Sequence, residues 1–139
     1  MKVIKRNGFK EDVNFNKITN RVRRIADEFG SVIVDPVLIS QKVCNAVHDN
    51  VKTTELDQLA ADIAIGMTTT HLDYGILAGH IIVSDMHKNI EHSFVEAMLL
   101  LYESGFLSVE VLNVVKNNEQ ILNDTVMKSR DYDFDFFVL

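Results

Sequence analysis

The sequence predicts a mainly α-helical protein, in which an N-terminal β-hairpin packs on a bundle of four helices and additional helices follow. Three observations support this prediction. An Asn-Gly pair separates two short β-prone runs within residues 2–13, which is the strongest short-range indication of a hairpin. Apolar residues then recur at helical spacing from residue 15 to about residue 90. Apolar residues make up 47% of the 139 residues and charged residues 24%, a composition that supports a packed core.

The hairpin is expected to turn at Asn7-Gly8, because both residues tolerate positive φ. With a two-residue turn, Lys5 would lie directly opposite Lys10. Opposed like charges disfavour a sheet by up to about 1 kcal/mol. We therefore expect either a different register or an anion bound near these lysines.

The first two helices follow the hairpin. One apolar stripe runs from Phe15 to Phe29, with Asn14 or Asn16 as the N-cap and Gly30 at the end. The next helix begins at Asp35-Pro36, an N-cap followed by proline at the first helical position.

Two more helices complete the predicted bundle. The third begins at Thr53-Thr54, where Thr54 and Asp57 have the spacing of a capping box. The fourth opens at Asp73 and continues toward Lys88.

The last third of the chain also has a globular composition. Phe94 to Tyr102 is apolar on nearly every side, and Ser108 can cap one further helix that continues to Leu122. Residues 131–139 alternate acidic and aromatic side chains. We expect the aromatic rings to be buried against another protein surface. Either this tail folds back on the helices, or its partner surface lies elsewhere.

The charge is distributed unevenly. The net formal charge is -6, yet residues 1–24 contain eight Lys and Arg against two acidic residues. The remaining residues contain six basic and 18 acidic side chains. Proteins that bind duplex nucleic acid need a broad basic surface, so we expect no nucleic-acid partner. A small polyanion bound near the N-terminal segment fits this distribution better.

Other classes of protein are disfavoured by composition. A single cysteine, Cys44, cannot form an internal disulfide or a thiolate metal cage, so a cytoplasmic location is expected. No apolar run is long enough to cross a membrane, and none follows the basic N-terminus as a signal peptide would require. No catalytic constellation and no metal-ligand set is recognisable, so none is assigned.

Basic side chains near the hairpin form the first candidate site. Lys5 and Arg6 precede the turn, and Lys17 lies in the first turn of the first predicted helix. Cations beside a helix N-terminus are suited to binding phosphate. The alternative is a solvated basic edge strand whose lysines prevent aggregation.

Thr53, Thr54 and Asp57 form a second candidate group. Their simplest role is to cap the third helix. They can also form a second polar wall of the same pocket, where Thr donates to a phosphate or sugar oxygen and Asp accepts from a ribose hydroxyl.

Four blocks of sequence resemble a known family. They are Val3-Ile4-Lys5-Arg6-Asn7-Gly8, then Val13-x-Phe15-Asn16-Lys17-Ile18, then Val51-x-Thr53-Thr54-Glu55-Leu56-Asp57-x-Leu59-Ala60, and His71-x-Asp73-Tyr74-x-Ile76-Leu77-Ala78. In this order and spacing they resemble the ATP-cone at the N-terminus of the class I ribonucleotide reductase large subunit, of the eukaryotic and viral type. The resemblance is firm to about residue 92 and looser beyond it.

The resemblance implies a domain division and an allosteric function. Residues 1–92 would form an ATP-cone nucleotide-binding domain, and residues 93–139 would begin the helical region of a large subunit. In this family, ATP in the cone permits reduction, and dATP inhibits it by promoting larger assemblies through cone-to-cone contacts. The effector would be ATP or dATP with Mg²⁺, and the chain alone would regulate rather than catalyse.

The resemblance also implies which residues bind the nucleotide. Phosphates would be held by Lys5, Arg6, Lys17 and Lys88. The adenine would face Glu11 and Ile18, while Thr53 and Asp57 would close the phosphate and sugar side. Phe15 and Asn16 lie in the same binding stretch.

One departure from the family concerns Asn16, where the family commonly has Asp. This change removes a negative charge beside the site and puts the nucleotide preference in question. A second departure is that the chain stops before the catalytic barrel, so reduction by this chain alone is not expected. The alternative function is a ligand-free helical interaction protein, or decoy, that assembles with a full-length reductase.

Overall fold

The computed structural model describes residues 1–90 and 93–139, and it confirms a mainly α-helical fold with an N-terminal hairpin. Two compact units are present. The first comprises Met1–Met86 with Tyr132–Leu139, and the second comprises His87–Asp131. The predicted boundary between residues 92 and 93 adjoins positions outside the described residues and stays a prediction.

The first unit begins with a small sheet whose strand order is β2-β1-β3. Its strands are β1 (Lys2–Ile4), β2 (Lys10–Asp12) and β3 (Val51–Lys52). Strand β1 pairs antiparallel with β2, with Ile4 opposite Lys10, and parallel with β3, with Ile4 opposite Lys52. The register therefore differs from that of a two-residue turn, and Lys5 does not lie opposite Lys10.

The turn itself explains this register. The Lys5 amide donates to the Phe9 carbonyl at 2.8 Å, and the Gly8 amide donates to the Lys5 carbonyl at 2.9 Å. Gly8 has φ of 82°, which an L residue adopts only with strain. This is a three-residue loop with a glycine in the left-handed region, a common alternative to the two-residue hairpin.

Helices α1 (Phe15–Glu28) and α2 (Pro36–Ala46) begin where the sequence predicts. The Asn14 side chain accepts from the Lys17 amide at 3.2 Å, so Asn14 and not Asn16 is the N-cap of α1. Asp35 caps α2 by accepting from the Val37 and Leu38 amides.

Helices α3 (Thr53–Gly66) and α4 (Asp73–Asn89) also begin as predicted, but the predicted capping box of α3 is wrong. Helix α3 starts two residues too early for it, because Lys52 and not Thr54 occupies the N-cap position. The Glu55 carboxylate then accepts from the Lys52 amide at 2.9 Å. The Asp57 side chain therefore does not cap α3 and can contact residues of other elements.

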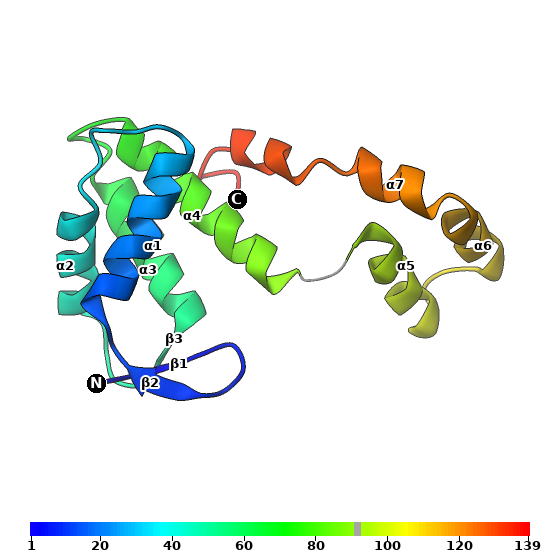
Figure 1. The fold of residues 1–139 in the computed structure, drawn as a ribbon, viewed down its shortest axis with the longest axis horizontal. Helices are drawn as coiled ribbons and strands as arrows, with labels where there is room; N and C mark the ends of the chain where they lie inside the picture. The colour runs from blue at the N-terminus through cyan, green and yellow to red at the C-terminus, as the bar shows by residue number, and fades with distance from the viewer. Residues whose placement is uncertain (91–92) are drawn as a thin grey trace. The chain divides into compact units, whose positions relative to one another are not determined.

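The four helices enclose the main core, with the hairpin at one end of the bundle (Figure 1). Ile25, Ile39, Val43, Leu77 and Ile81 are almost completely buried there. A smaller cluster of Val3, Val47 and Val51 anchors the sheet. Burying these side chains fixes the sheet against the helix bundle.

The C-terminal tail folds back on the first unit. Tyr132 packs against His80 of α4, with ring centroids 4.8 Å apart, and Phe136 contacts the main core. The backbone of the tail passes close to Gly79, where a Cβ would lie 3.4 Å from the Phe134 carbonyl oxygen. Phe137 nevertheless remains largely exposed.

The second unit contains α5 (Phe94–Glu103), α6 (Val109–Asn117), α7 (Glu119–Thr125) and most of the 3₁₀ helix η1 (Lys128–Asp133). Ser108 caps α6 as predicted, but the single helix expected up to Leu122 is two helices. Asn118 separates them, with φ of −121°. In the ranges that the structure describes, no helix is both long and apolar enough to cross a membrane.

Candidate nucleotide site

A pocket of about 330 Å³ lies beside the hairpin turn of the first unit. It is lined by Lys5, Arg6, Asn7 and Thr53. The parallel pairing of Ile4 with Lys52 creates this arrangement, because the next residues along the two strands are Lys5 and Thr53. Strand β3 therefore brings the start of α3 beside the basic hairpin.

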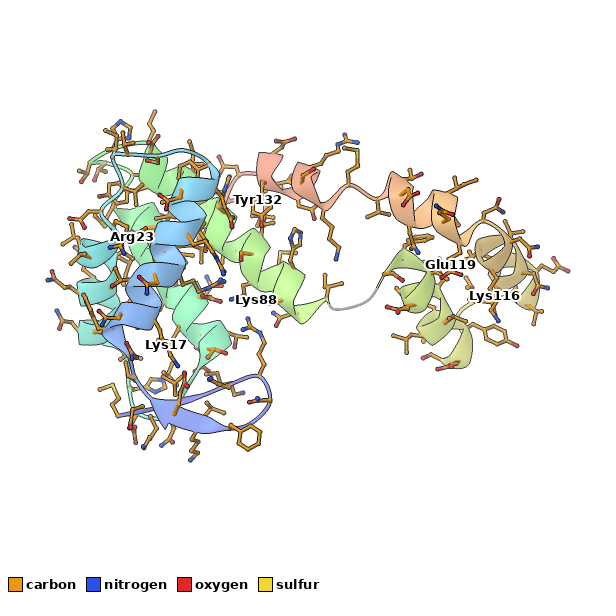
Figure 2. All side chains as sticks on the ribbon, in the orientation of Figure 1. Lys17, Arg23, Lys88, Lys116, Glu119 and Tyr132 are labelled. Atoms are coloured by element: carbon orange, nitrogen blue, oxygen red, sulfur yellow. The ribbon has the colours of Figure 1, made fainter. Side chains whose placement is uncertain are left out.

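Glu11 of β2 forms two ion pairs, one within the hairpin and one with α1. Its carboxylate lies 2.9 Å from the Lys5 ammonium and 3.0 Å from the Lys17 ammonium. Figure 2 labels Lys17 at the end of α1 beside the hairpin. Hydrogen bonds from Lys5 and then Lys17 lower the pKa of Glu11, so its charge holds both cations in place.

Asp57 is the centre of a second charged cluster and is only 7% exposed. Arg21 binds it with two hydrogen bonds, from Nε at 2.6 Å and from Nη2 at 2.9 Å. Arg6 also approaches Asp57, at 3.8 Å, and forms a short ion pair with Asp85 of α4. Arg6 thus joins the pocket to the interior of the bundle.

Asp85 differs from Asp57 in its electrostatic environment. Burial raises the pKa of the Asp85 carboxyl, and the neighbouring Asp57 raises it further, while Arg6 acts in the opposite direction. Asp85 is therefore the carboxyl of this cluster that takes up a proton more readily than an ordinary aspartate.

The other predicted site residues are distributed around the same end of the bundle. Phe15 and Ile18 are half-buried on α1, and Ile18 packs against the main core. Asn16 is exposed. Lys88 lies in the last turn of α4, within the second unit, so its relation to the pocket stays a prediction.

Three residues of the charged clusters were not predicted for the site: Arg21, Ser84 and Asp85. From the sequence alone, Arg21, Arg23 and Arg24 have no assigned ligand and are expected to face solvent or a partner cone. This expectation is wrong for Arg21, which binds Asp57. Arg21 lies four residues after Lys17 and thus on the same helix face, a spacing that could have identified it. Ser84 and Asp85 have no comparable indication in the sequence.

The chemistry of the site is that of anion binding. Lys5 and Arg6 are next to the N-terminus of α3, where backbone amides carry partial positive charge. Arg21 keeps one buried nitrogen, Nη1, without a hydrogen-bond partner among the described residues. No group of three or more His, Cys, Asp or Glu side chains suited to a metal ion occurs in residues 1–90 and 93–139.

Known proteins have sequences similar to this one. The large subunit of ribonucleoside-diphosphate reductase from Dictyostelium discoideum is 42% identical over 99% of this chain and 17% of its own length. Those from Danio rerio and Vaccinia virus (strain Copenhagen) are 40% and 38% identical over 99% of this chain. The chain spans 18% and 19% of their lengths.

The family comparison covers the hairpin and the four-helix bundle. The ATP cone domain matches residues 1–89, which include β1 to β3, helices α1 to α4 and all ten predicted site residues. This agrees with the resemblance found in the four sequence blocks. The chain therefore belongs to the ATP-cone domain family.

Proposed function

We propose that this chain is an allosteric nucleotide-binding module of a ribonucleoside-diphosphate reductase large subunit, with ATP as the activator and dATP as the inhibitor. The pocket formed by Lys5, Arg6, Asn7 and Thr53 carries this proposal. It combines two cations with a helix N-terminus, the arrangement that favours phosphate. Its volume of about 330 Å³ is within the range of small-molecule sites.

In this proposal, Lys5, Arg6 and Lys17 hold the phosphates, and Thr53 donates to a phosphate or sugar oxygen. Lys88 adds a further cation. Mg²⁺ enters with the triphosphate and neutralises part of its charge. Glu11 and Ile18 face the adenine, beside Phe15 and Asn16.

The proposed contact between Asp57 and the ribose is constrained, because Arg21 already binds both carboxylate oxygens of Asp57. A ribose hydroxyl would have to share those oxygens. One neutral hydrogen bond is worth about 0.5–1.5 kcal/mol, so direct contact with one hydroxyl discriminates ATP from dATP by roughly threefold to tenfold. The proposal therefore includes a small helix shift as a second source of discrimination.

Titration calorimetry with ATP and dATP in the presence of Mg²⁺ tests the proposal. We expect wild-type binding on the order of micromolar affinity. Lys5→Ala removes a cation that lines the pocket and is expected to weaken binding by about tenfold or more. Lys10→Ala is the matched control, since Lys10 is an exposed lysine on the neighbouring strand and does not line the pocket.

The alternative is an interaction protein that assembles with a full-length reductase without binding nucleotide. Exposed apolar residues at the start of α2 favour an assembly surface there: Val32, Ile33, Val37 and Leu38. These residues also serve cone-to-cone contacts in the first proposal. Absence of heat with either nucleotide, in a sample shown to be folded by circular dichroism, would reject the first proposal and favour the alternative.

A further inference from the structure

Arg6 is held by carboxylates of the protein itself, although it lines the pocket. Its guanidinium is paired with Asp85 and lies 3.8 Å from Asp57. Arginine binds carboxylate and phosphate with the same planar set of donors. A phosphate that enters the pocket must therefore compete with protein carboxylates for Arg6.

The two carboxylates differ in their hydrogen bonds with Arg21 and in their exposure to solvent. Asp57 accepts two hydrogen bonds from Arg21 and is nearly buried. Asp85 has a larger exposed side-chain fraction than Asp57, 19% against 10%. Displacing Asp57 would break its bidentate pair with Arg21, so the pairing of Arg6 with Asp85 is the one with which phosphate competes. Asp85 also forms a side-chain hydrogen bond with Asp57.

The carboxylates beside Arg6 act against an incoming anion. The charged groups facing Asp85 come from three elements: Arg6 from the hairpin, Arg21 from α1 and Asp57 from α3. A phosphate beside Arg6 would add negative charge near Asp85, and like charges at short range repel.

We infer that Asp85 sets the affinity for nucleotide by competing with the phosphates for Arg6. This inference rests on the proposed nucleotide site and adds its regulation. Binding requires Asp85 either to release Arg6 or to take up a proton. Asp85 is thus a positioning residue that holds Arg6 in the ligand-free protein.

The decisive variant is Asp85→Asn, which preserves the shape of the side chain and removes its charge. We expect it to bind ATP about threefold to tenfold more tightly than wild type, by calorimetry at about pH 7.5. Inorganic tripolyphosphate, which contains only the phosphate arm, is expected to show the same gain. Asp27→Asn is the matched control, because it removes the same charge from an exposed position near the far end of α1.

The pH dependence provides a second readout. Protonated Asp85 no longer competes for Arg6, and its raised pKa brings this protonation closer to neutral pH. The affinity ratio between Asp85→Asn and wild type is therefore expected to become smaller as the pH is lowered from about 7.5. Comparing the two proteins at each pH cancels the titration of the phosphate itself.

The outcomes separate this inference from the proposed function. Equal or weaker binding by a folded Asp85→Asn variant would overturn the inference and leave the nucleotide site intact. Absence of binding by wild type and both variants would reject the nucleotide site and the inference together. Asp85→Ser removes the same charge and carries the same expectation, and it replaces Asp85→Asn should the amide impair folding.

Discussion

Arg21 shows how one side chain connects the helix bundle to the candidate site. Its guanidinium binds both oxygens of Asp57 and lies 3.4 Å from the Ser84 hydroxyl. It therefore joins α1, α3 and α4 at the level of the pocket. Asp57 in turn stays in position beside Arg6, so the Arg21–Asp57 pair supports Arg6, the arginine that we propose binds phosphate.

Replacing Arg21 by methionine is expected to lower the free energy of unfolding by about 2 kcal/mol. The reason is that Asp57 would remain nearly buried, with Arg6 at 3.8 Å as a more distant cation. Urea unfolding followed by circular dichroism measures the change. Arg23→Met is the control, because Arg23 is exposed on the same helix and contacts Asn20, and it should cost less than about 0.5 kcal/mol. Equal losses in the two variants would contradict a supporting role for Arg21.

At the scale of elements, the hairpin loop decides where the two pocket cations lie. Residues 6–8 form a three-residue loop, and Gly8 takes the left-handed conformation with φ of 82°. This loop shifts the register by one residue from the two-residue turn and separates Lys5 from Lys10. The same register places Lys5 opposite Phe9 and beside the start of α3.

Gly8→Ala is expected to destabilise the chain by about 1 kcal/mol, because a Cβ is strained at this φ although no atom lies within 4 Å of it. Nucleotide binding should weaken with it, since the loop carries Arg6. Gly66→Ala is the contrasting control: Gly66 ends α3, has open space around it and has ordinary helical geometry. That variant should be neutral or stabilising by up to about 1 kcal/mol. Thermal unfolding of the two variants compares them directly, and a Gly8→Ala variant as stable as Gly66→Ala would argue against a strained turn.

At the scale of the whole molecule, the two units differ in how much apolar surface they bury. The first unit contains two clusters of buried side chains. In the second unit, the buried apolar residues among those described are Val95, Leu112 and Val115. Large apolar side chains there remain exposed, among them Phe106, Val114 and Ile121. Local stability follows buried apolar contact, so the second unit should open more readily.

Hydrogen exchange measured by mass spectrometry tests this difference within one sample. Amides of α5, α6 and α7 are expected to show protection factors at least about tenfold below those of α1 to α4. The helices of the first unit are the internal reference, since they share the same buffer and temperature. Similar protection in both units would show that the second unit is stabilised by more than its buried side chains.

Much of the helical part of the structure could be predicted from the sequence because its determinants are local. Asn14 and Asp35 cap their helices through their own side chains, and Ser108 does the same for α6. The apolar stripe predicted from Phe15 to Phe29 includes Val22 and Ile25, which are buried in the main core. The split at Asn118 was missed, because apolar residues continue at helical spacing on both sides of it.

The candidate site could be predicted only in part. Lys5, Arg6 and Thr53 were recognised from the sequence, and the pocket places them together. Two-residue strand β3, which brings Thr53 beside the hairpin, has no alternating pattern that a sequence could reveal. Asp85 was missed for a related reason, since its contact with Arg6 spans 79 positions along the chain.

The sequence by itself determined the starts of the first four helices, the basic N-terminal segment and the four blocks that identify the ATP-cone family, because caps, apolar periodicity and motif spacing are properties of neighbouring residues. Only the tertiary structure decided which charges meet. Arg6, Arg21, Asp57 and Asp85 come from four different elements, and each pairing depends on how those elements pack. The physical reason is that a partly buried charge must find a partner wherever the fold brings one near, whatever the distance along the chain.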